Sequence, residues 1–113
     1  MGIYRQFTDG EGQSHIEELN SATFESLMEW TDANAFRYHV HAPGTFLDWH
    51  PSSGKNIIVV LSGAIEITVT DGTSLVCKPG DLRMTSDTGK GHTGRVVGNE
   101  PCAVLMVHLG DHD

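Results

Sequence analysis

The stretch GTFLDWHPSSGKN, residues 44–56, contains a histidine that is well placed to do chemistry, His50. Imidazole transfers protons near neutral pH and is a common ligand of transition metals. Asp48 lies two residues earlier, and alternation along a strand places it on the same face as His50, about 7 Å away. A carboxylate in that place can ligate an ion, orient the imidazole or cap a loop. The pair is the first candidate for a site.

Other histidines extend the candidate set. His92 follows a glycine-rich turn in TGKGHT, and Asp87 precedes it in a loop, where a turn-stabilising role is favoured over ligation. His39 and His41 alternate in FRYHVH and form either a two-histidine ligand pair or a wet or dimer-facing surface. His108, in the apolar run VLMVHL, either lines a pocket or is a satisfied core residue. The sequence leaves the directions of the last three side chains open.

The elements that would position these side chains begin with a polar segment. Residues 1–20 contain the turn signal DGEG and resemble an edge strand or an arm. In SATFESLMEW, the apolar residues Phe24, Leu27 and Met28 have helical spacing, and Ser21 can cap the first turn. We therefore expect a short helix before the main domain.

From residue 36 onward the apolar period is two, interrupted by Gly, Pro, Asn and Asp. In AIEITVTDG the apolar residues alternate with polar ones and a turn follows, whereas NIIVVLSG is apolar on both faces. Short strands at this spacing predict an all-β antiparallel barrel or sandwich. The expected strands are 36–41, 44–50, 56–61, 64–70, 73–77, 81–85, 92–97 and 102–109.

Two segments resemble the two motifs of the cupin superfamily. Gly44, His50, Asn56 and Gly63 have the offsets of the first motif. The segment DGTSLVCKPGDLRMTSDTGKGHT, residues 71–93, resembles the second. The combination is more specific than either half. Among cupins, the chain looks most like small single-domain bacterial members with a Trp-His-Pro first motif and a D-T-G-K-G-H second motif.

The resemblance implies an antiparallel jelly-roll barrel, often a homodimer, with a small-molecule pocket between its sheets. His50 and His92 stand at the first and last histidines of the metal-binding pattern. Ser52 replaces the second histidine, and Asn56 replaces the glutamate. Because the anionic ligand is lost, the expected cofactor is either none or a weakly held divalent metal at His50 and His92.

Composition limits the remaining possibilities. The chain has 113 residues, 15 Asp and Glu against 7 Lys and Arg, and a net charge of −8, which argues against nucleic-acid and membrane partners. No long apolar run or basic leader occurs, so a cytoplasmic protein is expected. Cys77 and Cys102 are expected to be small buried residues. The expected organisation is an arm with a short helix at 1–35, a cupin barrel at 36–109 and a tail at 110–113.

Three classes of function remain open, and an enzyme is favoured. The first is acid-base chemistry of the isomerase, epimerase, cyclase or lyase type, with His50, His92 and Asp48 as catalytic residues. The second is a metal-dependent dioxygenase or isomerase with a substituted ligand set. The third is a non-catalytic binding or sensing module. The residues expected to contact the small organic ligand are Asn56, Tyr38, Phe46, Ile58, Val60, Met84, Met106 and His108.

Overall fold

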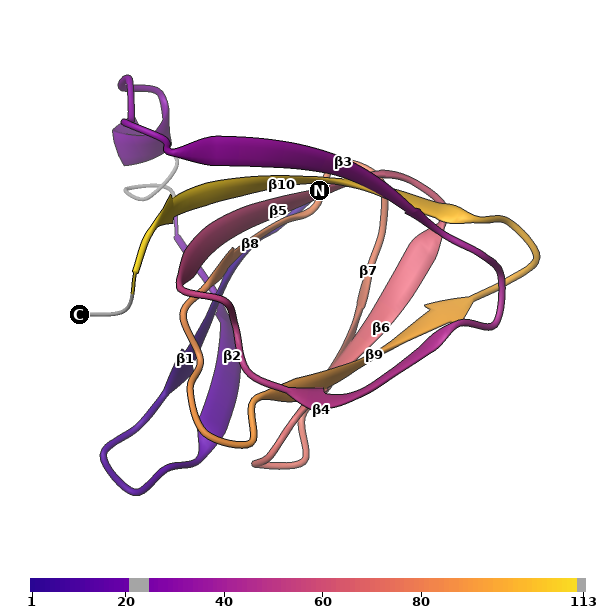
Figure 1. Ribbon diagram of the computed structural model, residues 1–113, viewed down its shortest axis with the longest axis horizontal. Coiled ribbons are helices and arrows are strands. Elements are labelled where there is room, and N and C mark those ends of the chain that lie inside the picture. The colour runs from indigo at the N-terminus through magenta and orange to yellow at the C-terminus, as the bar shows by residue number, and fades with distance from the viewer. Residues whose placement is uncertain (21–24, 112–113) are drawn as a thin grey trace.

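The computed structural model describes residues 1–20 and 25–111, and in this part of the chain ten strands form two facing sheets (Figure 1). The larger sheet has the order β2-β1-β8-β5-β10-β3 and the smaller one β4-β9-β6-β7. The strands are β1 (Ile3–Thr8), β2 (Ser14–Glu18), β3 (Ala35–His41), β4 (Phe46–His50), β5 (Lys55–Ser62), β6 (Ala64–Val69), β7 (Ser74–Cys77), β8 (Leu82–Thr85), β9 (His92–Val97) and β10 (Cys102–Gly110).

The all-β jelly-roll class expected from the sequence is confirmed, with two differences in detail. Residues 1–20 form a hairpin, and its first strand pairs with β8 in parallel, so the larger sheet is not wholly antiparallel. The sheets also face each other without closing into one barrel, because among the described strands β3 pairs only with β10 and β4 only with β9. The turn at residues 42–45 carries the chain from one sheet to the other.

The core lies between the sheets and follows the alternation seen in the sequence. On β6, Ile65, Ile67 and Val69 are buried while the residues between them are partly exposed. Gly72 then turns the chain with a positive φ of 94°. Both cysteines are buried and free, as expected. The central cluster consists of Ile58, Val60, Ile65, Ile67, Cys77, Val96, Cys102 and Val104.

The outer side of β3 is apolar and open to solvent. Phe36, Tyr38 and Val40 are 77%, 60% and 51% exposed, although they alternate as buried residues would. The expected homodimer stays a prediction. In residues 1–20 and 25–111, no helix has both the length and the apolar character needed to cross a membrane.

The short helix expected near residue 24 is described only in part. Residues 25–27 are helical, and the amide of Met28 donates to the carbonyl of Glu25 at 3.2 Å. Ser21 and Phe24, the expected cap and first apolar position, lie outside the described residues. Met28 is 85% exposed.

His15 joins the first hairpin to the turn after β6. Its Nε2 lies 2.6 Å from Oδ2 of Asp9, and its Nδ1 lies 2.7 Å from Oδ2 of Asp71. The hydrogen bonds to Asp9 and Asp71 raise the pKa of His15. The pKa of Asp9 is lowered, first by its bond to His15, and the pKa of Asp71 is lowered, first by its bond to Thr73. The three side chains form a clasp of charges at the surface.

This clasp predicts a pH-dependent contribution to stability. A raised histidine pKa contributes below the unfolded value of about 6.5 and is lost as pH rises through the folded value, whereas the lowered aspartate pKa values contribute above about pH 4. His15→Gln should therefore lower the melting temperature most between about pH 4 and 6.5, with a smaller difference near pH 9. Thermal melts of both proteins across this range test it; an equal difference at both ends would contradict the charge clasp.

Candidate functional site

A cavity of about 240 Å³ lies between the two sheets. Its volume is below the roughly 300–1,000 Å³ of pockets for drug-sized molecules, which favours a small ligand. Aliphatic side chains cover much of its wall, and arginine, histidine, serine, threonine and asparagine side chains supply its polar groups. The lining residues are Arg37, His41, Leu47, His50, Pro51, Ser52, Ser53, Asn56, Ile58, Ile65, Ile67, Arg83, Thr85, His92, Gly94, Val104 and Met106.

A bulge in β4 directs His50 into this cavity. Leu47 is paired with Gly94, and His50 with His92, so three steps along β4 match two steps along β9. One extra residue in a strand reverses the alternation beyond it. Leu47 and His50 therefore both face the cavity, although simple alternation would place them on opposite sides.

The same bulge corrects two expectations. Asp48 does not share the cavity face with His50; it is exposed, and its carboxylate accepts a hydrogen bond from the amide of Trp49 at 2.8 Å. Phe46 was expected to line the pocket, but it is 48% exposed and stacks under the guanidinium of Arg95. Neither side chain lines the cavity, because the alternation of β4 is broken between Leu47 and His50.

Tyr38 and Met84 are also placed outside the cavity. Tyr38 lies on the exposed side of β3, whereas Arg37 and His41 face inward. On β8, Arg83 and Thr85 are buried and line the cavity, while Met84 points to the other side. The prediction for Met84 assumed that the apolar residue of this strand faces the ligand. Because both faces of β8 are at least partly buried, the polarity of a side chain on this strand does not show which way it points.

The remaining candidates lie in or beside the cavity. His50, His92, Asn56, Ile58 and Met106 line it. The other two do not: Val60 is 2% exposed in the core, and His108 lines an adjoining hollow, where its Nδ1 lies 2.9 Å from Oδ1 of Asn56. Both Nδ2 hydrogens of Asn56 point to serine hydroxyls, those of Ser52 and Ser53. The rings of His39 and His41 are tilted by 53° with a centroid distance of 4.3 Å, and of the two only His41 lines the cavity.

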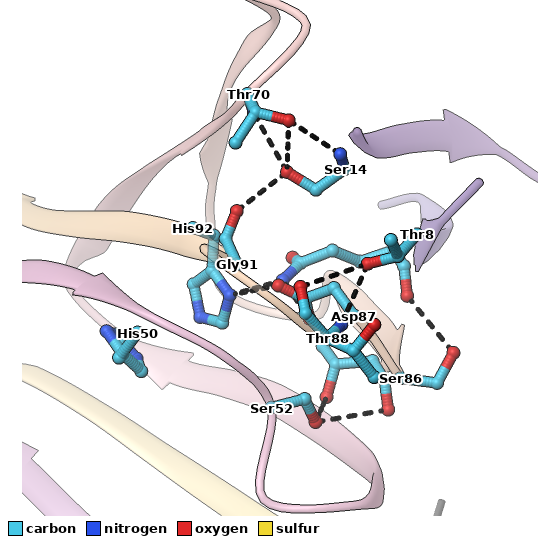
Figure 2. A network of polar contacts seen from close by, with 12 residues as sticks. Thr8, Ser14, His50, Ser52, Thr70, Ser86, Asp87, Thr88, Gly91 and His92 are labelled. Carbon is cyan, nitrogen blue, oxygen red and sulfur yellow. Dashed lines mark hydrogen bonds and ion pairs between the residues drawn. The ribbon is translucent and has the colours of Figure 1, made fainter. Parts of the chain in front are cut away.

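His92 is held by the buried carboxylate of Asp87, a residue expected from the sequence to stabilise a turn. Its Nδ1 lies 2.7 Å from Oδ2 of Asp87, and Oδ1 of Asp87 accepts a bond from Nε2 of Gln6 at 2.9 Å. Gln6 and Asp87 have no exposed surface. Figure 2 shows Asp87 on one side of the His92 ring and His50 on the other. Because Asp87 is an acceptor, His92 carries its proton on Nδ1 and leaves the Nε2 lone pair free.

The electrostatics of this pair follow from burial and hydrogen bonding. Burial lowers the pKa of His92, and this outweighs the opposing effect of Asp87, so the imidazole is neutral near pH 7. Burial alone would raise the pKa of Asp87, but bonds from His92 and Gln6 hold it below its usual value. The resting site is therefore a neutral imidazole backed by an ionised carboxylate.

His50 and His92 converge from neighbouring strands. Their ring centroids are 4.4 Å apart, with an angle of 57° between the rings. The Nδ1 of His50 lies 2.7 Å from the backbone carbonyl of Asp48, which fixes the tautomer in the same way. Asp48 thus acts on His50 through its main chain, not through the expected carboxylate.

Comparison with known proteins identifies the family. The profile described as Cupin domain matches residues 36–108. The chain belongs to the cupin family. No protein with a curated description gives a significant match.

Solved structures similar to this cupin agree on the fold. A predicted oxalate decarboxylase from Thermotoga maritima is 21% identical with a TM-score of 0.54, covering 94% of this chain and 90% of its own. An uncharacterized conserved protein with a double-stranded β-helix domain from Klebsiella pneumoniae is 24% identical with a TM-score of 0.54, covering 69% of each chain. A cupin domain from Bordetella pertussis is 14% identical with a TM-score of 0.54, covering 66% of this chain and 79% of its own. At these identities the likeness concerns the fold alone.

The donor set of this cupin does not fit a metal ion held by three protein ligands. His50 and His92 present suitable nitrogens, but the cavity lining contains no Asp or Glu, and Oδ1 of Asn56, the atom that could bind a metal, lies 2.9 Å from Nδ1 of His108. Within the described residues, no group of three or more His, Cys, Asp or Glu side chains is arranged for a metal. Structural and catalytic metal sites usually take at least three ligands from the protein.

Arg83, Gln6 and Asp87 are the site residues whose roles the sequence did not reveal. Arg83 and Gln6 lie on strands in which the adjacent residues do not indicate which face points inward. Asp87 lies five residues before His92 across a glycine turn, and a turn-stabilising role was favoured for it. The spacing in D-T-G-K-G-H was a usable signal, because such a turn lets the carboxylate fold back onto the imidazole.

Gly91 sets the close approach of the two histidine strands. Its φ is 76°, and an added Cβ would collide with the carbonyl oxygen of His50. Its own carbonyl accepts a 2.6 Å bond from Oγ of Ser14 (Figure 2). Gly89 has a similar φ of 66°, but nothing lies within 4 Å of an added Cβ.

These two glycines make a matched pair for a test. Gly89→Ala should cost about 1–2 kcal/mol of unfolding free energy, the usual penalty of a left-handed residue. Gly91→Ala should cost clearly more, since the backbone of His50 must also move. Denaturant unfolding measures both. Equal losses in the two variants would show that the approach of the strands is not tight.

Proposed function

We propose that this cupin binds a small organic molecule between its sheets and acts on it by proton transfer. His92 is the base, Asp87 orients it, and His50 is the second proton-carrying group. The reaction is of the isomerase, epimerase, cyclase or lyase type. The observation that carries this proposal is the buried contact between Asp87 and His92, with Nε2 of His92 left free beside His50.

The environment of His92 suits a general base. A base is useful when it is unprotonated at the working pH, and burial lowers the pKa of His92. When Nε2 takes a proton, the ionised Asp87 at 2.7 Å stabilises the imidazolium. The aliphatic wall of Ile58, Ile65 and Ile67 keeps the surroundings poorly solvated, which strengthens these contacts.

His50 complements His92 because it is partly exposed. Its Nδ1 is held by the carbonyl of Asp48, so Nε2 is the position that exchanges a proton. A partly exposed group such as His50 exchanges protons with water, whereas the buried His92 does so poorly. The pair therefore supports removal of a proton at one atom of the ligand and delivery at another.

Hydrogen exchange in D₂O tests proton transfer without knowledge of the net reaction. A panel of small hydroxy and keto compounds is incubated with the protein, and NMR follows loss of individual C–H signals. We expect exchange of one compound that falls by about 100-fold or more in His92→Ala. His50→Ala should lose net turnover as well. Unchanged turnover in both variants would sink the proposal, and saturable binding without exchange would favour a binding module.

Asp87→Asn separates orientation from simple packing. The amide keeps the shape of the carboxylate but donates where Asp87 accepts, so it favours the wrong tautomer of His92. We expect kcat to fall by about 100- to 10,000-fold, with KM little changed. The histidine tautomer is read by ¹⁵N NMR. Full activity in the variant would show that Asp87 has only a structural role.

Metal analysis distinguishes proton transfer by the protein from metal-assisted chemistry. Protein purified without a histidine tag is analysed for iron, nickel, manganese and zinc. We expect less than about one metal per ten chains, because two neutral imidazoles hold divalent ions weakly. Near-stoichiometric metal that disappears in His50→Ala would replace the present proposal with the metal-dependent one.

Lys90→Ala is the matched surface control for the metal analysis, because the Lys90 side chain lies over Trp49 and does not line the cavity.

A further inference from the structure

Arg83 is a buried cation in the wall of the cavity. It lies on β8, between β1 and β5, and is 5% exposed. Within the described part of the chain, its Nη1 donates to Oε1 of Gln6 at 2.7 Å, whereas Nε is buried with no acceptor within reach. Burying a charged group with unpaired donors is costly. Arg83 lines the cavity, so a ligand acceptor that reaches the guanidinium from there would reduce that cost.

The protein does not neutralise this guanidinium itself. No ion pair joins Arg83 to an Asp or Glu of the described residues. The charge of Asp87 influences Arg83, but the carboxylate oxygens of Asp87 already accept hydrogen bonds from Gln6 and His92. The charge of the Arg83 side chain is therefore met by a neutral amide.

The cavity as a whole has the opposite charge to the chain. The sequence contains 15 acidic and 7 basic side chains, yet the cavity lining includes two arginines, three histidines and neither Asp nor Glu. Arg37 stands at the rim, where it also borders the adjoining hollow, and its Nη2 donates to Sδ of Met106 at 3.5 Å. An anion would find complementary charge here and repulsion over much of the remaining surface.

We propose that the cavity holds its ligand by a carboxylate group that pairs with Arg83, with Arg37 adding attraction at the rim. The proposal gives the chemical class of the ligand for the function proposed above. Only the reaction of the ligand rests on that function; its binding does not. A planar guanidinium matches the two oxygens of a carboxylate. The pairing also places the ligand near His92, because Gln6 contacts both Arg83 and His92 at 2.7 Å.

Binding of matched ligands tests the proposal without any turnover. Acetate, pyruvate, malonate and benzoate are titrated into the full chain at about pH 7. Binding is followed by NMR of the isoleucine methyl groups, because Ile58, Ile65 and Ile67 line the cavity. Acetamide and benzamide are the neutral counterparts, and inorganic phosphate is the alternative anion. At least one carboxylate should perturb these methyl groups, with an affinity about 10-fold or more above its amide.

Variants locate the anion. Arg83→Gln should weaken the bound carboxylate by about 10-fold or more, and Arg83→Lys by less, since it keeps the charge but not the planar fork. Arg37→Gln should have a smaller effect. Arg95→Gln is the matched control, because that guanidinium lies over Phe46 on the outside and should leave affinity unchanged. The carboxylate and amide comparison on the unaltered protein stands even if Arg83→Gln does not fold.

Three outcomes would overturn the proposal. They are equal binding of a carboxylate and its amide, binding of phosphate alone, and no methyl perturbation by any carboxylate at about 10 mM. Carboxylate binding that persists in Arg83→Gln would overturn the assignment to this residue. Carboxylate binding without hydrogen exchange in D₂O would count against the proton-transfer function and leave the anion site intact.

Discussion

The order of donors and acceptors from Arg83 to His92 is the constraint on which the site depends. Arginine can only donate, so Gln6 must turn its Oε1 towards Arg83 and its Nε2 towards Asp87. Asp87 then accepts from Gln6 and from His92, and His92 is left with a free Nε2. An amide flip at Gln6 would place donor against donor at Arg83 and acceptor against acceptor at Asp87. The buried arginine thereby fixes the orientation of Gln6, and the ionised carboxylate of Asp87 fixes the tautomer of His92 in the other sheet.

This chain of contacts also ties the two sheets together at the end of the cavity. Gln6 and Arg83 belong to the larger sheet, His92 to the smaller one, and Asp87 to the loop between them. Because the four side chains are buried, each lost contact leaves a polar group without water. The arrangement therefore fixes the geometry of the site along with its chemistry. Within the described residues, no backbone pairing joins β8 to β9 across the cavity, so these side-chain hydrogen bonds connect the two sheets there.

The sequence predicted the strands and the fold well because these depend on local alternation. All eight strands expected beyond residue 35 occur within two residues of their predicted ends. The side chains of the site were harder, since direction depends on register. The bulge between Leu47 and His50 moved Asp48 and Phe46 outward, and the covered outer face of β8 hid the inward direction of Arg83. Neither feature has a local sequence signal, because both arise from pairing with distant strands.

The two histidines differ in what holds them, and the proposed reaction gives them unequal parts for this reason. His92 is 6% exposed and backed by a buried carboxylate, so its ring is fixed and its charge is costly unless a proton arrives from the ligand. His50 is partly exposed and backed only by a main-chain carbonyl beside the β4 bulge. In the proposed reaction His50 is therefore the group that exchanges with water, and His92 is the group that takes the ligand proton.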